Sequence, residues 1–436
     1  MGYRKCQTAE AAVGMLYYMS DIAGTGGRLK EQAEDFVVDE ISCPPERAES
    51  GRFTIATVQV RNWETNRMVW MLSRQLGISR ERIGFAGTKD KRAVTTQLMS
   101  FQMPSENLER IHLQDMTVTN PYPARRPVRI GDLIGNRFRI RVTHCTAVPA
   151  DIPGILETVR SEVAAVGGFP NYFGVQRFGV VRPITHIMGE LIVRGDLEGA
   201  VRCYLSAPAV VEGPEAAAAR KELATRSDWK ELIRLMPPAM DFEKALVSHL
   251  IEEPDDWAGA IGCLPTNLQM MFVHAYQSYL FNLMLSERIR CGLPLNRPVV
   301  GDIVVPLDAD RVPIHDDQVL TTAANIDLVE RQVKLGKAYV TAALYGSTGR
   351  FAEGEMGEIE RAVIAREHLE PEDFVVPELP HCTSEGSRRE IVCPVRDLTC
   401  AAEPDTDNYT VSFSLPKGNY ATCLMREFMK SDMGDY

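Results

Sequence analysis

Strand patterns occur near both ends of the chain, and a long helical stretch separates them. Segments with alternating or β-branched residues lie at 35–42, 51–62 and 93–103, and again at 389–398 and 409–416. From about residue 151 to residue 370 the apolar residues mainly follow helical spacing, with strand-like runs only at 301–308 and 337–346. A helical segment between strands of one domain is best explained as an insert. The sequence therefore predicts an α+β fold, in which a large helix-rich α/β insert interrupts a mixed-sheet domain.

Length and composition indicate a folded protein of more than one domain. The chain has 436 residues, about three times the ~150 of a typical domain, and 45% of them are hydrophobic. The ten cysteines form no C-x-x-C pair, and the eight histidines have no zinc-ligand spacing beside them, so we expect reduced thiols and no metal. No apolar run approaches the ~20 residues that cross a bilayer. We therefore expect a cytoplasmic protein that does not associate with a membrane.

The net charge of −11 is distributed unevenly. Residues 51–150 carry 16 basic and 7 acidic side chains, a net charge of +9, whereas residues 151–436 carry 27 basic and 43 acidic side chains. A uniformly acidic surface would repel a polyanion, but a basic region can bind one locally. The pattern indicates a negatively charged partner that engages one part of the molecule.

The clearest predicted strand, 136–142, separates apolar from basic side chains. Its alternation places Phe138 on one face with two aliphatic residues, and Arg137, Arg139 and Arg141 on the other. Three further arginines precede it between residues 125 and 129. Arginine presents a rigid fork to oxyanions, so we take Arg139 and Arg141 as candidates for phosphate contacts. A merely solvated strand face is the alternative.

The most unusual local sequence is the glycine-opened turn from Gly84 to Gln97. It packs Asp90 between Lys89 and two further cations, Lys91 and Arg92. Nearby cations favour the ionised carboxylate, and Lys89 and Arg92 are candidates for binding an RNA phosphate. A turn in which the aspartate caps its own backbone is the alternative. A phosphate-binding P-loop fits less well, because Gly-Thr-Lys reverses the order that such a loop requires.

Residues 171–179, NYFGVQRFG, combine aromatic, amide and glycine residues at the predicted domain joint. Aromatic rings such as Phe173 can stack on a base, while Asn171 and Gln176 can pair with a base edge and Arg177 with a phosphate. These four residues are further candidates for substrate binding. The alternative is a hinge that is packed by its own aromatic side chains.

Five segments together resemble the TruD family of transfer-RNA pseudouridine synthases. They are RLKEQAEDFVVDE (28–40), AGTKDKRAVTTQ (86–97), GNRFRI (135–140), NYFGVQRFG (171–179) and LPKGNYATCLMRE (415–427). Each motif alone is weak, but five in order along nearly the whole chain are specific. The resemblance implies a pseudouridine-synthase-like catalytic domain made of residues 1–168 and 381–436. It also implies an inserted domain of the TruD type at 169–380.

The resemblance further implies the reaction and its residues. A uridine in the D arm of transfer RNA, uridine 13, would be isomerised with no cofactor, no metal and no obligatory partner protein. Asp90 matches the catalytic aspartate of the family, and Lys30 matches the basic residue that pairs with it. Asn136 and Phe138 match residues that position the target uracil and stack on it.

The chemistry of this isomerisation needs one carboxylate and a dry pocket. The N1–C1′ bond breaks, the uracil rotates, and its C5 joins C1′. The carboxylate can attack C1′, add at C6 or remove the C2′ proton, and the sequence leaves these three routes open. A non-catalytic RNA-binding protein or RNA chaperone that uses the same basic face is the alternative function, and it would not need Asp90.

Overall fold

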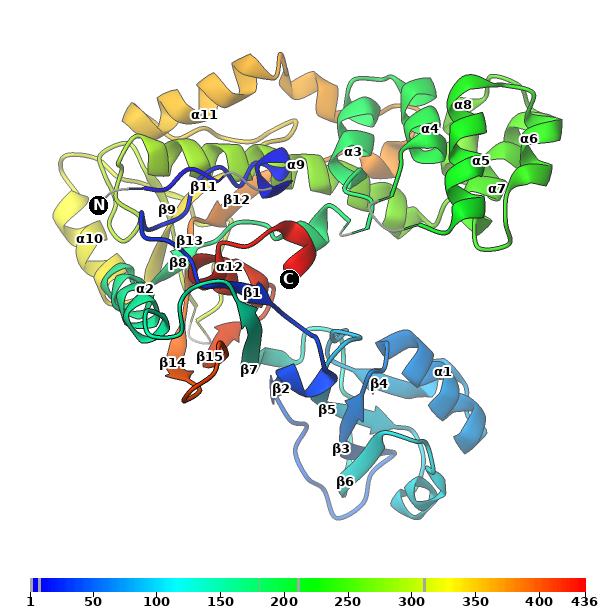
Figure 1. Ribbon diagram of the computed structural model, residues 1–436, viewed down its shortest axis with the longest axis horizontal. Helices are drawn as coiled ribbons and strands as arrows, with labels where there is room; N and C mark the ends of the chain where they lie inside the picture. The colour runs from blue at the N-terminus through cyan, green and yellow to red at the C-terminus, as the bar shows by residue number, and fades with distance from the viewer. Residues whose placement is uncertain (1–2, 7–8, 180, 210–211, 309–310) are drawn as a thin grey trace. The chain divides into compact units, whose positions relative to one another are not determined.

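The computed structural model describes residues 3–6, 9–179, 181–209, 212–308 and 311–436 (Figure 1). The chain forms two compact units. The sheet unit comprises Ile22–Phe169 and Cys393–Tyr436, and the helical unit comprises Met1–Asp21 and Pro170–Val392. The predicted α+β fold with a helix-rich insert is confirmed. The chain passes between the units at 169/170 and 392/393, where we expected 168/169 and 380/381, and its first 21 residues belong to the helical unit.

The sheet unit is built on one mixed sheet with the strand order β14-β15-β7-β2-β5-β3-β6. Two short strands extend it, because β1 pairs with β7 and β4 pairs with β5. The strands are β1 (Gly26–Arg28), β2 (Phe36–Ser42), β3 (Phe53–Arg61), β4 (Ile83–Phe85), β5 (Val94–Phe101), β6 (Met116–Ala124), β7 (Leu133–Cys145), β14 (Arg396–Ala402) and β15 (Tyr409–Pro416). The helices of this unit are α1 (Thr65–Leu76), α2 (Ile152–Val166) and α12 (Ala421–Met429).

The long strand β7 joins the early and late parts of the sheet unit. It pairs antiparallel with β2 on one side and with β15 on the other, so that Phe138 lies opposite Val38 and Phe413. Side chains paired across neighbouring strands point to the same face, and the apolar residues of β7 therefore share one buried face with those of β2 and β15. The alternation predicted for residues 136–142 thus places the apolar side chains of β7 on this buried face.

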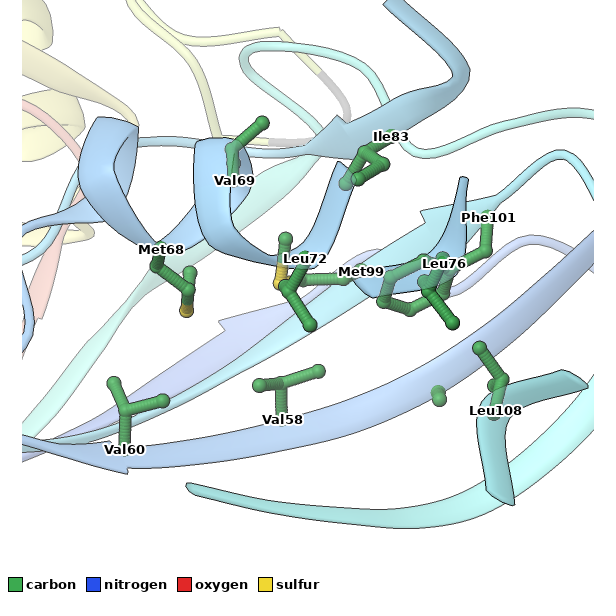
Figure 2. Packing of buried hydrophobic residues seen from close by; sticks show 11 residues of the cluster. Val58, Val60, Met68, Val69, Leu72, Leu76, Ile83, Met99, Phe101 and Leu108 are labelled. Atoms are coloured by element: carbon green, nitrogen blue, oxygen red, sulfur yellow. The ribbon is translucent and has the colours of Figure 1, made fainter. Parts of the chain in front are cut away.

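Helix α1 covers one part of the same sheet. Glu64 caps its first turn by accepting hydrogen bonds from two backbone amides, and Gly77 ends it in the left-handed conformation with φ of 67°. Figure 2 shows Met68, Leu72 and Leu76 packed over the sheet, beside Val58 of β3 and Met99 of β5. The apolar stripe predicted from spacing is thus the face that holds α1 on the sheet.

Strand β6 was not predicted from the sequence. It contains Pro121 and Pro123, which remove two backbone donors and usually argue against a strand. The structure accommodates both prolines because β6 is the last strand of the sheet order, with β3 as its neighbour in that order.

The helical unit surrounds the long helix α9. The helices are α3 (Thr185–Val193), α4 (Leu197–Ser206), α5 (Pro214–Thr225), α6 (Trp229–Leu235), α7 (Asp241–Glu252), α8 (Trp257–Gly262), α9 (Thr266–Arg290), α10 (Ile326–Lys334) and α11 (Gly354–Arg366). A small sheet has the order β10-β9-β11-β12, with bounds Val319–Leu320, Ile303–Pro306, Ala338–Leu344 and Ser387–Glu390 in that order. The remaining strands, β8 (Gly168–Pro170) and β13 (Val392–Pro394), contain the points where the chain changes unit. Figure 1 shows α11 running beside α9, and α9 is buried on most sides, with polar residues such as Gln277, Ser278 and Asn282 buried beside the apolar ones.

Candidate active site

Lys30 and Asp90 form an ion pair in the sheet unit. The Nζ atom of Lys30 lies 3.0 Å from Oδ1 of Asp90, although the two residues are 60 positions apart. The side chain of Lys30 is 14% exposed and that of Asp90 is 43% exposed. A half-exposed carboxylate beside a nearly buried ammonium can reach a substrate while its own charge is balanced.

The segment between β1 and β2 fixes Lys30. Lys30 adopts a left-handed backbone conformation with φ of 59°, which turns the chain directly before the 3-10 turn at Ala33–Asp35. Its Nζ atom lies 4.4 Å from the centre of the Phe36 ring, a cation–π contact. The next residue, Glu31, accepts hydrogen bonds from Thr143 Oγ1 and pairs with Nε2 of His144 at 2.8 Å. The Phe36 ring therefore contacts the ammonium, and Glu31 ties the adjacent backbone to β7.

A buried ion pair fixes the loop that carries Asp90. Nζ of Lys89 lies 2.7 Å from Oε2 of Glu40, and the two side chains are 5% and 0% exposed. The backbone amide of Lys89 donates to Thr65 Oγ1 at 2.9 Å, where α1 begins. Lys89, expected as a phosphate contact, is thus engaged by the protein's own carboxylate. Of the remaining cations around Asp90, Lys91 and Arg92 are exposed.

Glu40 holds three parts of the site together. Besides Lys89, its carboxylate accepts hydrogen bonds from Ser42 Oγ at 2.8 Å and from the backbone amide of Leu98 at 3.4 Å. The loop of Asp90 is therefore tied to β2 and β5 through one buried carboxylate. Glu40 was not predicted as a site residue from the sequence. The sequence did contain a signal, since Glu40 falls on the same alternation as the apolar Phe36 and Val38. A carboxylate on a buried face needs a cation.

Asn136 and Phe138 lie on the sheet face that carries Phe36 and Glu40. Asn136 is paired across the strands with Glu40, and its Oδ1 atom is buried without a hydrogen-bond partner among the described residues. The Phe138 ring is 6% exposed and stacks on Phe413, with centroids 5.3 Å apart. An unpaired amide oxygen beside aromatic rings is suited to hold a polar base edge.

A second amide on this face, Gln97, was quoted within a motif but given no role. It lies on β5 opposite Val58, its side chain is buried, and neither Oε1 nor Nε2 has a partner among the described residues. Through Thr95, which pairs with Val38, it shares the face of Phe36 and Glu40.

The arginine face of β7 points the other way. Arg137, Arg139 and Arg141 alternate with Phe138, so they lie on the sheet face opposite Lys30 and Asp90. Arg139 is exposed. Arg141 forms hydrogen bonds of 2.6 and 2.8 Å with Glu403, which raise its pKa and lower that of Glu403. Any phosphate bound by Arg139 would lie behind the sheet as seen from Asp90.

The aromatic motif at 171–179 belongs to the helical unit, whereas Lys30 and Asp90 belong to the sheet unit. Asn171 is buried and both ends of its amide are used, with Nδ2 donating to the Glu390 carbonyl and Oδ1 accepting from Arg389. Arg389 also lies 4.2 Å from the centre of the buried Phe173 ring. Gln176 is exposed, and Nε of Arg177 donates to Ser278 Oγ at 3.3 Å. Asn171 and Phe173 therefore support the local fold, while Gln176 lies at the surface.

A scan of the sequence against family models matches residues 12–428 to the family described as tRNA pseudouridine synthase D (TruD). The chain belongs to the TruD family. A relative named probable tRNA pseudouridine synthase D, from Methanosarcina mazei, is 40% identical over 97% of each chain. TruD relatives of the same name from Natronomonas pharaonis and Thermococcus onnurineus are 40% and 38% identical, covering 98% and 95% of this chain and 99% and 97% of their own length. A TruD crystal structure from Methanosarcina mazei superposes with a TM-score of 0.89 at 38% identity, covering 99% of this chain and 100% of its own.

The described residues contain neither a cluster suited to a metal ion nor a helix suited to span a membrane. Among the described residues, no three His, Cys, Asp or Glu side chains gather in a way that could hold a metal ion. None of the helices in the described part of the chain is long and apolar enough to cross a membrane.

Proposed function

We propose that this protein isomerises uridine 13 in the D arm of transfer RNA to pseudouridine, with Asp90 as the nucleophile or base. The observation that carries the proposal is the 3.0 Å ion pair between Lys30 and Asp90 on the sheet face that also holds Asn136. Membership of a family of tRNA pseudouridine synthases supports the choice of reaction and partner. The D arm and the role of Asp90 rest on the motif resemblance described above.

The residues of the site have different roles in the reaction. The Lys30 ammonium balances the negative charge of Asp90 without blocking it, since 43% of the Asp90 side chain remains exposed. The buried oxygen of Asn136 accepts a hydrogen bond from an imide or amide N–H of the uracil, which restricts the base while it is detached from the ribose. The low exposure of Phe36 and Phe138 keeps water from the floor of the site, which prevents water from reacting at C1′ while the uracil is detached.

A uridine within a folded RNA must leave its stack before Asp90 can reach it. Flipping a base costs a few kcal/mol, and stacking and hydrogen bonds in the enzyme recover that cost. The exposed Lys91 and Arg92, which directly follow Asp90, are placed to bind the phosphates next to the flipped nucleotide.

The decisive variant is Asp90→Asn. It keeps the size of the side chain but cannot attack carbon or take up a proton, so we expect normal folding, transfer-RNA binding at least as tight as wild type, and no pseudouridine. Mapping of pseudouridine in transfer RNA after incubation with each protein is the measurement. Appreciable turnover by Asp90→Asn, in preparations free of wild-type enzyme, would refute the role of Asp90.

The same assay separates the reaction from its alternative. A non-catalytic RNA-binding protein would leave every uridine unchanged with wild-type protein as well. Sequencing the product also locates the modified position, so a pseudouridine outside the D arm would support the reaction and overturn the proposed position.

Lys30→Met tests the partner of Asp90, because it retains the approximate length of the side chain at residue 30 and removes the charge beside Asp90. We expect slower turnover with RNA binding maintained.

A further inference from the structure

Helix α1 carries a solvent-facing stripe of tryptophan and arginine that the reaction described above does not use. The stripe consists of Trp63, directly before the helix, and Arg67, Trp70 and Arg74 on it. The guanidinium of Arg67 lies 5.9 Å from the Trp63 ring, and that of Arg74 lies 5.0 Å from the Trp70 ring. The opposite side of α1 is the apolar stripe packed on the sheet, so one face of the helix contributes to the core and the other faces solvent.

Exposure of the apolar Trp70 ring to water is energetically unfavourable, and Trp70 does not belong to the hydrophobic core cluster. Its side chain is 38% exposed, whereas the core-facing Met68 and Leu72 are 1% and 0% exposed. Trp63 is different, because it packs against the core cluster and its Nε1 donates to the Gln114 carbonyl at 3.3 Å. An indole that projects into solvent between arginines is a surface on which an aromatic ring can stack.

The stripe is joined to the candidate active site through the start of α1. Thr65, the first residue of the helix, accepts the hydrogen bond from the backbone amide of Lys89, next to Asp90. With a rise of 1.5 Å per residue, Trp70 lies roughly 7 Å along the helix axis from Thr65 and Arg74 roughly 13 Å. An RNA strand that leaves Asp90 in this direction would pass along the stripe.

Charge favours a polyanion at this place. Residues 51–150, which include α1, have a net charge of +9, and the one carboxylate at the start of the helix, Glu64, is bound to the backbone amides of Asn66 and Arg67. The helical unit, by contrast, carries 24 basic and 35 acidic side chains. Base stacking on aromatic rings together with arginine contacts to phosphate is the usual way in which proteins bind unpaired RNA.

We propose that Trp63, Arg67, Trp70 and Arg74 form a second RNA-binding surface, on which an unpaired base of the substrate stacks against Trp70 while Arg67 and Arg74 contact its phosphates. This inference rests on the proposed function only for the identity of the RNA. The surface orients the substrate next to the active site and takes no part in the bond-breaking steps.

The test measures binding of an unmodified transfer-RNA transcript, with all variants made in Asp90→Asn so that the RNA stays unchanged. We expect Trp70→Ala to weaken binding about ten-fold, because loss of one base–aromatic stack has an effect of this order. Trp70→Phe keeps an aromatic ring and should bind within about three-fold of the parent. Because Trp70 is outside the core, the thermal midpoint should be the same in all three proteins.

Arg74 has a matched control in the helical unit. Arg202 lies over Trp229 and Trp257 at 5.7 and 5.5 Å, so it shares the cation–π contact of Arg74, but its charge is already paired with Glu198 at 2.7 Å in the acidic part of the chain. Arg74→Gln should lower the slope of log affinity against log salt by about 0.7, the value for one contact to a single strand. Arg202→Gln should leave the slope unchanged. Equal slopes for both variants would overturn the inference.

Fluorescence gives an independent readout. The chain has four tryptophans, so Trp229→Phe combined with Trp257→Phe leaves only those of the stripe. Transfer RNA should quench their emission, and Trp70→Phe should remove most of that quenching while preserving affinity. Unchanged binding by Trp70→Ala would refute the second surface, even where the enzyme with Asp90 forms pseudouridine normally. Weakened binding with no pseudouridine formed by wild-type protein would instead refute the proposed function and keep the surface.

Discussion

At the scale of single residues, one buried carboxylate, that of Glu40, fixes the loop that carries Asp90. Glu40 does not contact Asp90, yet it anchors Lys89 at 2.7 Å and reaches the backbone of Leu98 at 3.4 Å. Its partner, Lys89, directly precedes Asp90 in the chain. A shift of the Lys89 side chain would therefore also move the Asp90 carboxylate. Glu40 is thus a positioning residue, and Lys30 is the residue that balances the charge.

Glu40→Gln should damage both stability and rate. The amide leaves the buried Lys89 ammonium without an opposite charge, and breaking a buried pair costs about 3–5 kcal/mol of unfolding free energy, reduced here because the amide oxygen still accepts a hydrogen bond. We expect a loss of about 2–4 kcal/mol in urea unfolding and a lower kcat with KM nearly unchanged. Glu34→Gln is the control, since the pair of Glu34 with Arg61 is exposed and should leave the unfolding midpoint unchanged. A Glu40→Gln protein with wild-type kcat would show that the pair does not position Asp90.

At the scale of elements, one glycine before the Asp90 loop, Gly84, is required for close packing. A Cβ atom on Gly84 would lie 2.2 Å from the Val128 carbonyl oxygen, which is backbone and cannot move aside easily. Nearby, the Gly131 amide donates to the Ala86 carbonyl at 2.9 Å. The turn that follows β6 is therefore packed against the strand that leads to Asp90.

Gly84→Ala should accordingly destabilise the sheet unit and lower activity. Gly154 in α2 is the matched control, because a Cβ there meets nothing within 4 Å. Alanine has the higher helix propensity, so Gly154→Ala should be neutral or stabilising by up to about 1 kcal/mol. Thermal unfolding of the two variants is the measurement, and equal midpoints would contradict the role of the close approach.

The elements also show what could be predicted from the sequence and what could not. α1 and β7 were predicted because their apolar periodicity is fixed locally, by the spacing of Met68 and Leu72 and by the alternation around Phe138. The loop of Asp90 was found because its charge pattern is unusual. The pairing of Glu40 with Lys89 was missed, since it joins two segments 49 residues apart, and β6 was missed because its prolines are tolerated only at a sheet edge. The direction of Arg139 relative to Asp90 depends on the register of three strands, which no single segment encodes.

At the scale of the whole molecule, charge separates the two units. The sheet unit carries 24 basic and 24 acidic side chains, so the net charge of −11 belongs to the helical unit. We therefore expect RNA binding to depend steeply on salt in spite of a pI of 5.4. Arg139→Gln should flatten the slope of log affinity against log salt, whereas Arg141→Gln should change it less, since Glu403 already engages Arg141. Identical slopes for Arg139→Gln and wild type in a filter-binding titration would show that the arginine face is only solvated.

The reaction itself should not need a metal ion. Uracil isomerisation exchanges one bond to C1′ for another and requires no Lewis acid, and a carboxylate with a neighbouring ammonium supplies the groups that it uses. Structured RNA often needs magnesium to fold, so the comparison requires a prefolded minimal substrate with and without chelator. Equal single-turnover rates are expected, and strict dependence on a transition metal would contradict this prediction.

The discontinuous sheet has a consequence for how the protein is made. β7 ends at Cys145, but its neighbour β15 begins only at Tyr409, after the helical unit has been synthesised. At 5–20 residues per second, a ribosome needs roughly 15–50 s to cover that interval. During this time the Phe138 edge of β7 lacks Phe413 and presents unpaired backbone groups, which is a risk for aggregation. Nascent chains that stop before Tyr409 should therefore bind chaperones and be cleaved by protease within β7, whereas complete chains should be protected there.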